Sequence, residues 1–124
     1  MKVLIIEDNI ERQEKFKQLF QNQQVYIFDN IIDAFEVCKT IEFNIACLDH
    51  DLDHRVWVDS NEENTGYNFL RLILNYNCQT NKAVLKRSLI YIHSMNVVGA
   101  NRMLNLLKDE GYDGIWYPFY LWKF

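Results

Sequence analysis

The sequence predicts a single α/β domain built on a parallel five-stranded sheet with helices on both faces. Short aliphatic runs alternate along the chain with segments whose apolar residues recur at helical spacing, as in consecutive strand–helix units. The first run, Val3 to Ile6, is apolar at every position, which is typical of a strand covered on both sides. The chain has 124 residues, 49% of them hydrophobic, so we expect one compact domain over residues 1–124.

The first half of the chain predicts three strands and two helices. After the first strand, Asn9 can cap a helix. The apolar residues of this helix are Phe16, Leu19 and Phe20. Val25 to Phe28 is a β-branched and aromatic run that predicts the second strand, and a helix from Ile31 to Thr40 follows it. The apolar stripe of that helix is Ile31, Ala34, Phe35 and Cys38. Asn44 to Leu48 predicts the third strand.

The second half begins with a polar stretch from Asp53 to Asn64, which we interpret as a solvated loop rather than a substrate lid. Thr65 then caps a helix over Gly66 to Tyr76. The residues of this helix expected to face inward are Leu70, Ile73 and Leu74. Leu89 to Ile92 predicts the fourth strand.

The last helix and strand complete the pattern. The helix has apolar residues at i, i+3, i+4 and i+7, namely Ala100, Met103, Leu104 and Leu107. Gly111 ends this helix as a left-handed cap. A short fifth strand, Ile115 to Tyr117, precedes Pro118. The aromatic tail that follows is too short for a fifth helix, and we expect it to cover the sheet where that helix is missing. The alternative is that the tail is a homodimer surface.

Composition excludes several classes of protein. The formal net charge is −4, so the chain has no overall basic field to attract nucleic acid or a membrane. No apolar stretch approaches the ~18 residues of a membrane-spanning helix, and the short apolar run at the start does not resemble a signal peptide. Cys38, Cys47 and Cys78 are widely spaced without a CxxC motif. We therefore expect reduced thiols and a cytoplasmic protein without a membrane partner.

Polar residues gather where the predicted strands end. Five strands in this order fit the flavodoxin-like order 2-1-3-4-5, in which ligands bind at the carboxyl ends of strands 1 and 3. Glu7 and Asp8 end the first strand and should face Asp49 and Asp51, which end the third. His93 ends the fourth strand and is the expected neighbour. Converging carboxylates repel each other unless a proton or cation neutralises them, and oxygen ligands suit Mg²⁺ or Mn²⁺.

Two histidines at the same edge favour a reaction over simple metal storage. His50 lies between Asp49 and Asp51, and histidine titrates near neutral pH. Cleavage of a phosphoester requires a cation, an activated water and a proton donor, and this edge offers candidates for all three. Ser94 and Asn96 can donate hydrogen bonds to phosphate oxygens. His54, further along the chain, is a weaker candidate.

The segments KVLIIEDN, ACLDHDL and TGYNFLRLI, with the strand ending at His93 and Ser94, resemble the receiver domains of two-component response regulators over nearly the whole chain. In that family, paired acids after strand 1 bind Mg²⁺ and an Asp ending strand 3 accepts a phosphoryl group. Glu7, Asp8 and Asp49 match those positions, and Ser94 matches the hydroxyl residue that ends strand 4. The resemblance implies a CheY-like fold.

The chain departs from receivers in two respects. Receivers carry Lys before the Pro that follows strand 5, whereas this chain has Tyr117 before Pro118, and the fifth helix is missing. LDHDL and IHSMN-x-x-GA instead resemble a receiver-derived family described as cyclic-phosphate-processing receiver-like domains. The residues that match its two motifs are Asp49, His50, Asp51, His93 and Asn96. The resemblance implies activity on cyclic phosphate ends of RNA or on related nucleotides.

We therefore predict a metal-dependent phosphoesterase that opens a cyclic phosphate on an RNA end or a nucleotide. Its expected metal ligands are Glu7, Asp8, Asp49 and Asp51; its catalytic residues Asp49, His50 and His93; its substrate-binding residues Ser94 and Asn96. The alternatives are a stand-alone receiver phosphorylated on Asp49 and a nucleotide-binding module without catalysis. The acids also resemble the metal site of Toprim nucleases, but that site requires a differently ordered sheet.

Overall fold

A computed structural model of the chain describes residues 1–52 and 64–123. Its elements are β1 (Lys2–Ile6), α1 (Ile10–Leu19), β2 (Gln24–Phe28), α2 (Ile31–Cys38), β3 (Ile45–Leu48), α3 (Gly66–Thr80), β4 (Leu89–Ile92), α4 (Val97–Asp109), β5 (Gly114–Trp116) and the 3-10 helix η1 (Phe119–Leu121). The five strands are parallel and lie in the order β2-β1-β3-β4-β5. The predicted fold class is confirmed. His54 and most of the Asp53 to Asn64 stretch lie outside the described residues.

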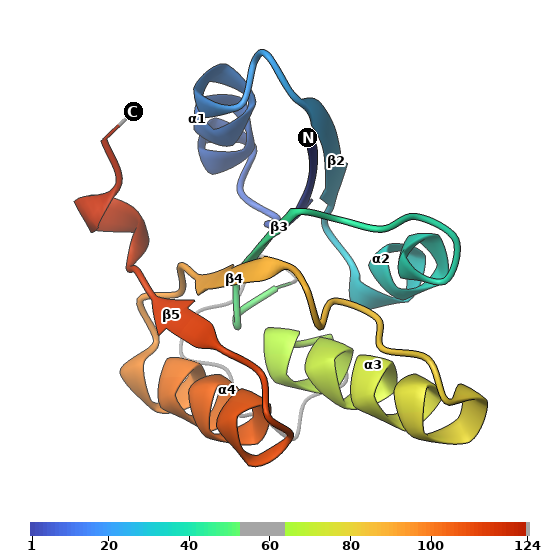
Figure 1. Cartoon of the computed structure of the whole chain (residues 1–124). Helices are drawn as coiled ribbons and strands as arrows, with labels where there is room; N and C mark the ends of the chain where they lie inside the picture. The colour runs from blue at the N-terminus through green and yellow to red at the C-terminus, as the bar shows by residue number, and fades with distance from the viewer. Residues whose placement is uncertain (53–63, 124) are drawn as a thin grey trace.

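Two apolar cores lie on the two faces of the sheet, as Figure 1 shows with α1 and the C-terminal segment on one face and α2, α3 and α4 on the other. The side chains of β1 alternate between these cores because successive residues of a strand point to opposite faces. Val3 and Ile5 belong to the core under α1, whereas Leu4 and Ile6 belong to the core under α2 to α4. This alternation also determines the orientation of the polar residues that follow each strand.

The predicted helix caps are present. The side chains of Asn9 and Thr65 accept hydrogen bonds from the backbone N–H of Arg12 and Asn68, at the starts of α1 and α3. Gly111 has φ of 76° and follows α4, as expected for a left-handed cap.

Three helices differ in detail from the sequence-based prediction. α3 runs to Thr80 rather than Tyr76, because its polar last turn continues until Asn81 adopts the left-handed conformation. α2 ends at Cys38, two residues before the predicted end. In α1 the buried residue is Phe16, whereas Leu19 is 40% exposed.

The aromatic tail covers the α1 face of the sheet. Phe119 and Trp122 pack against the core on this face, and both rings lie edge-on to Phe16, with centroids 5.7 and 5.2 Å away. Trp122 also contacts Tyr91 of β4, at 5.5 Å between centroids. The tail thus occupies the place of the missing fifth helix, as predicted. All three cysteines are free, and no helix in the described part of the chain is long and apolar enough to cross a membrane.

Candidate active site

The register of the sheet brings three chemically active residues into one row. Ile6, Leu48 and Ile92 are register partners at the carboxyl ends of β1, β3 and β4. The ladder continues one residue further, since the N–H of Asp49 donates to Ile6 O at 3.1 Å and the N–H of His93 donates to Leu48 O at 3.0 Å. Glu7, Asp49 and His93 therefore follow three adjacent strands at the same level. We call these three residues the β-edge trio.

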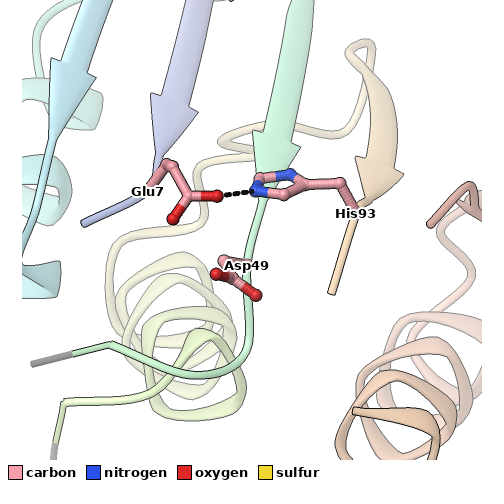
Figure 2. A group of neighbouring side chains, drawn as sticks. All are labelled: Glu7, Asp49 and His93. Atoms are coloured by element: carbon pink, nitrogen blue, oxygen red, sulfur yellow. Dashed lines mark hydrogen bonds and ion pairs between the residues drawn. The ribbon is translucent and has the colours of Figure 1, made fainter. Parts of the chain in front are cut away.

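The side chains of the β-edge trio converge on the α1 face. Each offers one ligand atom, and these atoms all lie within 4.8 Å of one another. His93 Nε2 lies 3.2 Å from Glu7 Oε1, the interaction drawn in Figure 2. Glu7 and His93 are fully buried and Asp49 is 5% exposed. Two carboxylates and an imidazole thus share a space shielded from water.

Burial and mutual charge shift the two carboxylates in opposite directions. Burial by itself raises the pKa of Glu7, but the hydrogen bond and charge of His93, the N–H of Asn9 and the charge of Arg12 outweigh it and lower the pKa to about 2. Burial raises the pKa of Asp49 to about 7, against the opposing effects of His93 and Arg12. The β-edge trio therefore holds one firmly ionised carboxylate and one that exchanges a proton near neutral pH.

The donor set of the β-edge trio fits a divalent cation. His93 Nε2 is the ring nitrogen that faces Glu7, so it supplies the nitrogen of this donor set. The other ring nitrogen, Nδ1, is buried and has no hydrogen-bond partner in the described part of the chain. Two carboxylates suit Mg²⁺, and imidazole as a third donor suits Mn²⁺ better. The trio can therefore hold either metal of the predicted pair.

A second set of side chains lies at the start of α4, on the other face of the sheet. His50 is buried, and its Nδ1 lies 2.7 Å from Asp51 Oδ1. Asn96 donates from Nδ2 to the same Asp51 oxygen at 3.0 Å, while its Oδ1 accepts from the N–H of Gly99 and caps α4. We call His50, Asp51 and Asn96 the α4 cluster.

The predicted site residues are thus divided between two faces. The side chain of Asp49 points to the α1 face. Because successive residues of an extended chain point to opposite faces, the side chain of His50 points to the α4 face. Asp8 and Asp51 are not members of the group that can hold an ion. Ser94 is 1% exposed, and its Oγ accepts a hydrogen bond from the N–H of Asn96 at 3.1 Å.

Sequence reasoning missed Arg12 as a member of the site. Its Nη1 lies 3.6 Å from Glu7 Oε1, at the exposed side of the β-edge trio. The signal was present in the sequence: Arg12 falls in the first turn of a helix that begins directly after the acidic pair, within reach of the strand end. Sequence reasoning also missed the contact of Gly66 with the site, where a Cβ atom would collide with the carbonyl oxygen of Asp49.

Comparison with known families identifies the chain. Residues 3–109 match the model of the cyclic-phosphate processing Receiver domain, and the chain belongs to this family. No curated protein matches the chain.

Several solved structures similar to this chain are receiver domains. One is the receiver domain of the sensor histidine kinase PA1611 from Pseudomonas aeruginosa PAO1, which was solved with a magnesium ion in its active site cleft. It superposes with a TM-score of 0.65 at 16% sequence identity, and the match covers 94% of this chain and 83% of that chain. The receiver domain of Ssk1 from Saccharomyces cerevisiae, solved with Ypd1, gives a TM-score of 0.65 at 16% identity over 95% and 79%. A CheY-like receiver from Methylobacillus flagellatus gives 0.62 at 18% identity over 95% and 85%. These likenesses support the CheY-like fold.

Proposed function

We propose that this chain is a metal-dependent phosphoesterase that hydrolyses a cyclic phosphate, with a 2′,3′-cyclic phosphate on an RNA end or a nucleotide as substrate. The observation that carries this proposal is the buried β-edge trio, whose ligand atoms lie within 4.8 Å of one another, in a chain of the cyclic-phosphate processing Receiver family. Glu7 and Asp49 would hold the ion, with His93 outside its coordination sphere. Asp8 would supply further negative charge after β1, whereas Asp51, on the α4 face, contacts His50. A bound divalent cation would neutralise phosphate oxygens and activate a water.

The reaction needs one proton acceptor and one proton donor. A water oxygen forms a bond to phosphorus, and the bond from phosphorus to one ribose oxygen breaks. One histidine takes a proton from the water and the other gives a proton to the leaving oxygen, so the products are a phosphomonoester and a hydroxyl group. We assign these two roles to His50, on the α4 face, and His93, on the α1 face, so the substrate would lie across the carboxyl edge of the sheet between them. Two contacts support this assignment: Asp51 Oδ1 lies 2.7 Å from His50 Nδ1, and Glu7 Oε1 lies 3.2 Å from His93 Nε2, so each ring has a carboxylate that can orient it.

Ser94 and Asn96 act at the substrate phosphate in this proposal. The oxygens of both side chains already accept backbone hydrogen bonds at the start of α4. Their contribution therefore includes holding the loop after β4 in place. Asn96 also donates to Asp51, which links the loop to His50.

A second candidate is a receiver that accepts a phosphoryl group on Asp49, which is favoured by the position of Asp49 directly after β3 in a receiver-like fold. Tyr117 in place of the receiver Lys argues against it. A module that binds a nucleotide without catalysis is the third candidate.

Two substrates offered to the same preparation separate these candidates. With Mn²⁺ present, the protein is incubated with acetyl phosphate and, separately, with 2′,3′-cyclic AMP. The proposed enzyme gives adenosine monophosphate and no stable aspartyl phosphate, as read by chromatography and intact mass. A mass increase of one phosphoryl group on Asp49, without ring opening, would establish the receiver. Neither reaction, in protein shown to bind Mn²⁺, would favour the binding module.

A further inference from the structure

Arg12 is a cation in contact with the buried acids. Its Nη1 lies 3.6 Å from Glu7 Oε1, and its side chain is 29% exposed whereas that of Glu7 is fully buried. The guanidinium group therefore lies between the β-edge trio and solvent. A substrate approaching the trio from this side meets Arg12 first.

Three elements fix the position of the guanidinium group. Its carbon Cζ lies 4.8 Å from the ring centroid of Phe119, in a cation–π contact. Its Nη2 lies 3.9 Å from the Sδ of Met95, in the loop between β4 and α4. Phe119 is itself anchored to the site, because its N–H donates to the carbonyl oxygen of His93 at 2.9 Å. Arg12 is thus held where α1, the β4–α4 loop and the tail meet.

The contacts of Arg12 leave its capacity for hydrogen bonding largely unused. A guanidinium has five N–H donors, arranged to bind two oxygens of a carboxylate or phosphate side by side. In the described structure Arg12 makes one long side-chain hydrogen bond, to the Met95 sulfur, and its distance to Glu7 is that of an ion pair rather than a close bidentate contact. Glu7 also has other partners, since it accepts from the N–H of Asn9 and contacts His93.

We propose that Arg12 binds the phosphate group of the substrate and that Phe119 is the positioning residue that holds the guanidinium for this purpose. The inference rests on the proposed function and assigns its anion-binding group. Two buried carboxylates repel a phosphate. A divalent cation bound by the trio would only neutralise their charge, so attraction of a phosphate requires a further positive charge beside the trio. Arg12 is positioned to be that group. If a bound metal neutralised Glu7, the N–H donors of Arg12 would be available to phosphate oxygens.

This role predicts opposite effects on two ligands. In Arg12→Ala, Mn²⁺ binds more tightly, by about threefold, because a positive charge beside Glu7 is gone. Inorganic phosphate, added to the Mn²⁺-loaded protein, binds about 10- to 100-fold more weakly, as expected for loss of charge-assisted hydrogen bonds. In Arg12→Lys, phosphate binding is intermediate, since a Lys retains the charge without the paired donors. Both ligands are titrated by calorimetry.

Two matched variants complete the test. Lys15 lies on the same helix with its Nζ 5.8 Å from the same Phe119 ring, so Lys15→Ala removes a neighbouring cation and should change phosphate affinity less than twofold. Phe119→Leu keeps apolar volume but removes the cation–π contact. It should weaken phosphate binding by about threefold and leave Mn²⁺ affinity unchanged. A loss of stability without a change in phosphate affinity would show that Phe119 is merely structural.

Phosphate binding is measured without turnover, so the two proposals fail separately. Phosphate affinity that is equal in wild type, Arg12→Ala and Arg12→Lys overturns the role of Arg12, even if the wild type opens cyclic phosphates. Arg12-dependent phosphate binding in a protein that opens no cyclic phosphate supports the anion site and contradicts the proposed function. Wild-type protein that binds Mn²⁺ but no phosphate also overturns the inference.

Discussion

The imidazole ring of His50 lies against the backbone of Gly99. A Cβ atom at Gly99 would fall 2.6 Å from both Nδ1 and Cδ2 of that ring, a distance at which one group must move. Gly99 lies in the first turn of α4, and Asn96 caps the same turn while bonding to Asp51. The first turn of α4 therefore packs closely against the His50 ring. The packing of this helix thus helps to hold the α4 cluster in place.

Gly99→Ala tests this relationship. We expect the new methyl group to displace the His50 ring and to lower the free energy of unfolding by about 1–3 kcal/mol, as for other overpacked sites. Urea denaturation measures the effect. The control is Asn101→Ala, at an exposed position of the same helix, which should change stability by less than about 0.5 kcal/mol. Equal stability of Gly99→Ala and wild type would contradict the close packing.

Asp49 makes the stability of the metal-free protein depend on pH. An unfolded Asp loses its proton near pH 3.8, whereas Asp49 in the folded protein loses it near pH 7. Between these values the folded state holds one more proton, so the free energy of unfolding falls as pH rises from about 4 to about 7. Glu7 has the opposite effect at lower pH. Its pKa is about 2 in the folded state and 4.5 in the unfolded state, so the free energy of unfolding falls as pH falls below 4.5.

Asp49→Asn removes this proton equilibrium. Asn retains an oxygen that can accept the hydrogen bond from the N–H of His50. In EDTA at pH 8 the variant should be more stable than wild type by a few kcal/mol, since each pKa unit corresponds to about 1.36 kcal/mol, and the difference should shrink toward pH 4. Denaturant titrations at several pH values provide the measurement. Curves that stay parallel over this range would show that Asp49 titrates normally.

Glu7 should dominate metal affinity. Glu7→Gln removes a buried, ionised member of the β-edge trio, and we expect Mn²⁺ affinity to fall about tenfold or more in calorimetric titrations. Glu11→Gln is the matched control, because it removes an exposed carboxylate from the first turn of α1 and should leave affinity nearly unchanged. If the two variants bind Mn²⁺ with the same affinity, Mn²⁺ binding does not depend on the β-edge trio.

The tail should contribute to the stability of the α1 face. Trp122→Ala removes ring contacts with Phe16, Tyr91 and Tyr117, and we expect a loss of about 1–3 kcal/mol in the free energy of unfolding. Tyr120→Ala, at a residue that is 68% exposed on the 3-10 helix preceding Trp122, should have little effect on a monomer. A homodimer through the tail remains a prediction; light scattering on Tyr120→Ala tests it, and a fall in mass would support it.

Much of the fold follows from local sequence signals. Asn9 and Thr65 act as caps because their side chains are the acceptors that the first helical turn requires, and Gly111 takes the backbone conformation that favours glycine. The exact end of α3 was not predicted, because polar residues continue a helix as readily as they end it. The helix ends where Asn81 adopts the left-handed conformation.

The sequence predicted which polar residues follow the strand ends, but not how the two faces of the sheet divide them. Glu7, Asp49 and His50 all follow strand ends, and the sequence-based prediction grouped them together. The period of two along a strand, continued one residue past its end, separates Asp49 from His50 and joins it to Glu7. Arg12 was missed for a different reason: its contact with Glu7 depends on the docking of α1 against the sheet, which is a tertiary relationship.

Ring opening of 2′,3′-cyclic AMP by wild type and by Asp49→Asn, each with Mn²⁺ and with EDTA, tests the central claim most directly. We expect release of adenosine monophosphate by wild type with Mn²⁺, none with EDTA, and none by Asp49→Asn although the variant remains folded. Turnover by Asp49→Asn at the wild-type rate, or turnover unaffected by EDTA, would contradict the claim that the β-edge trio carries the reaction.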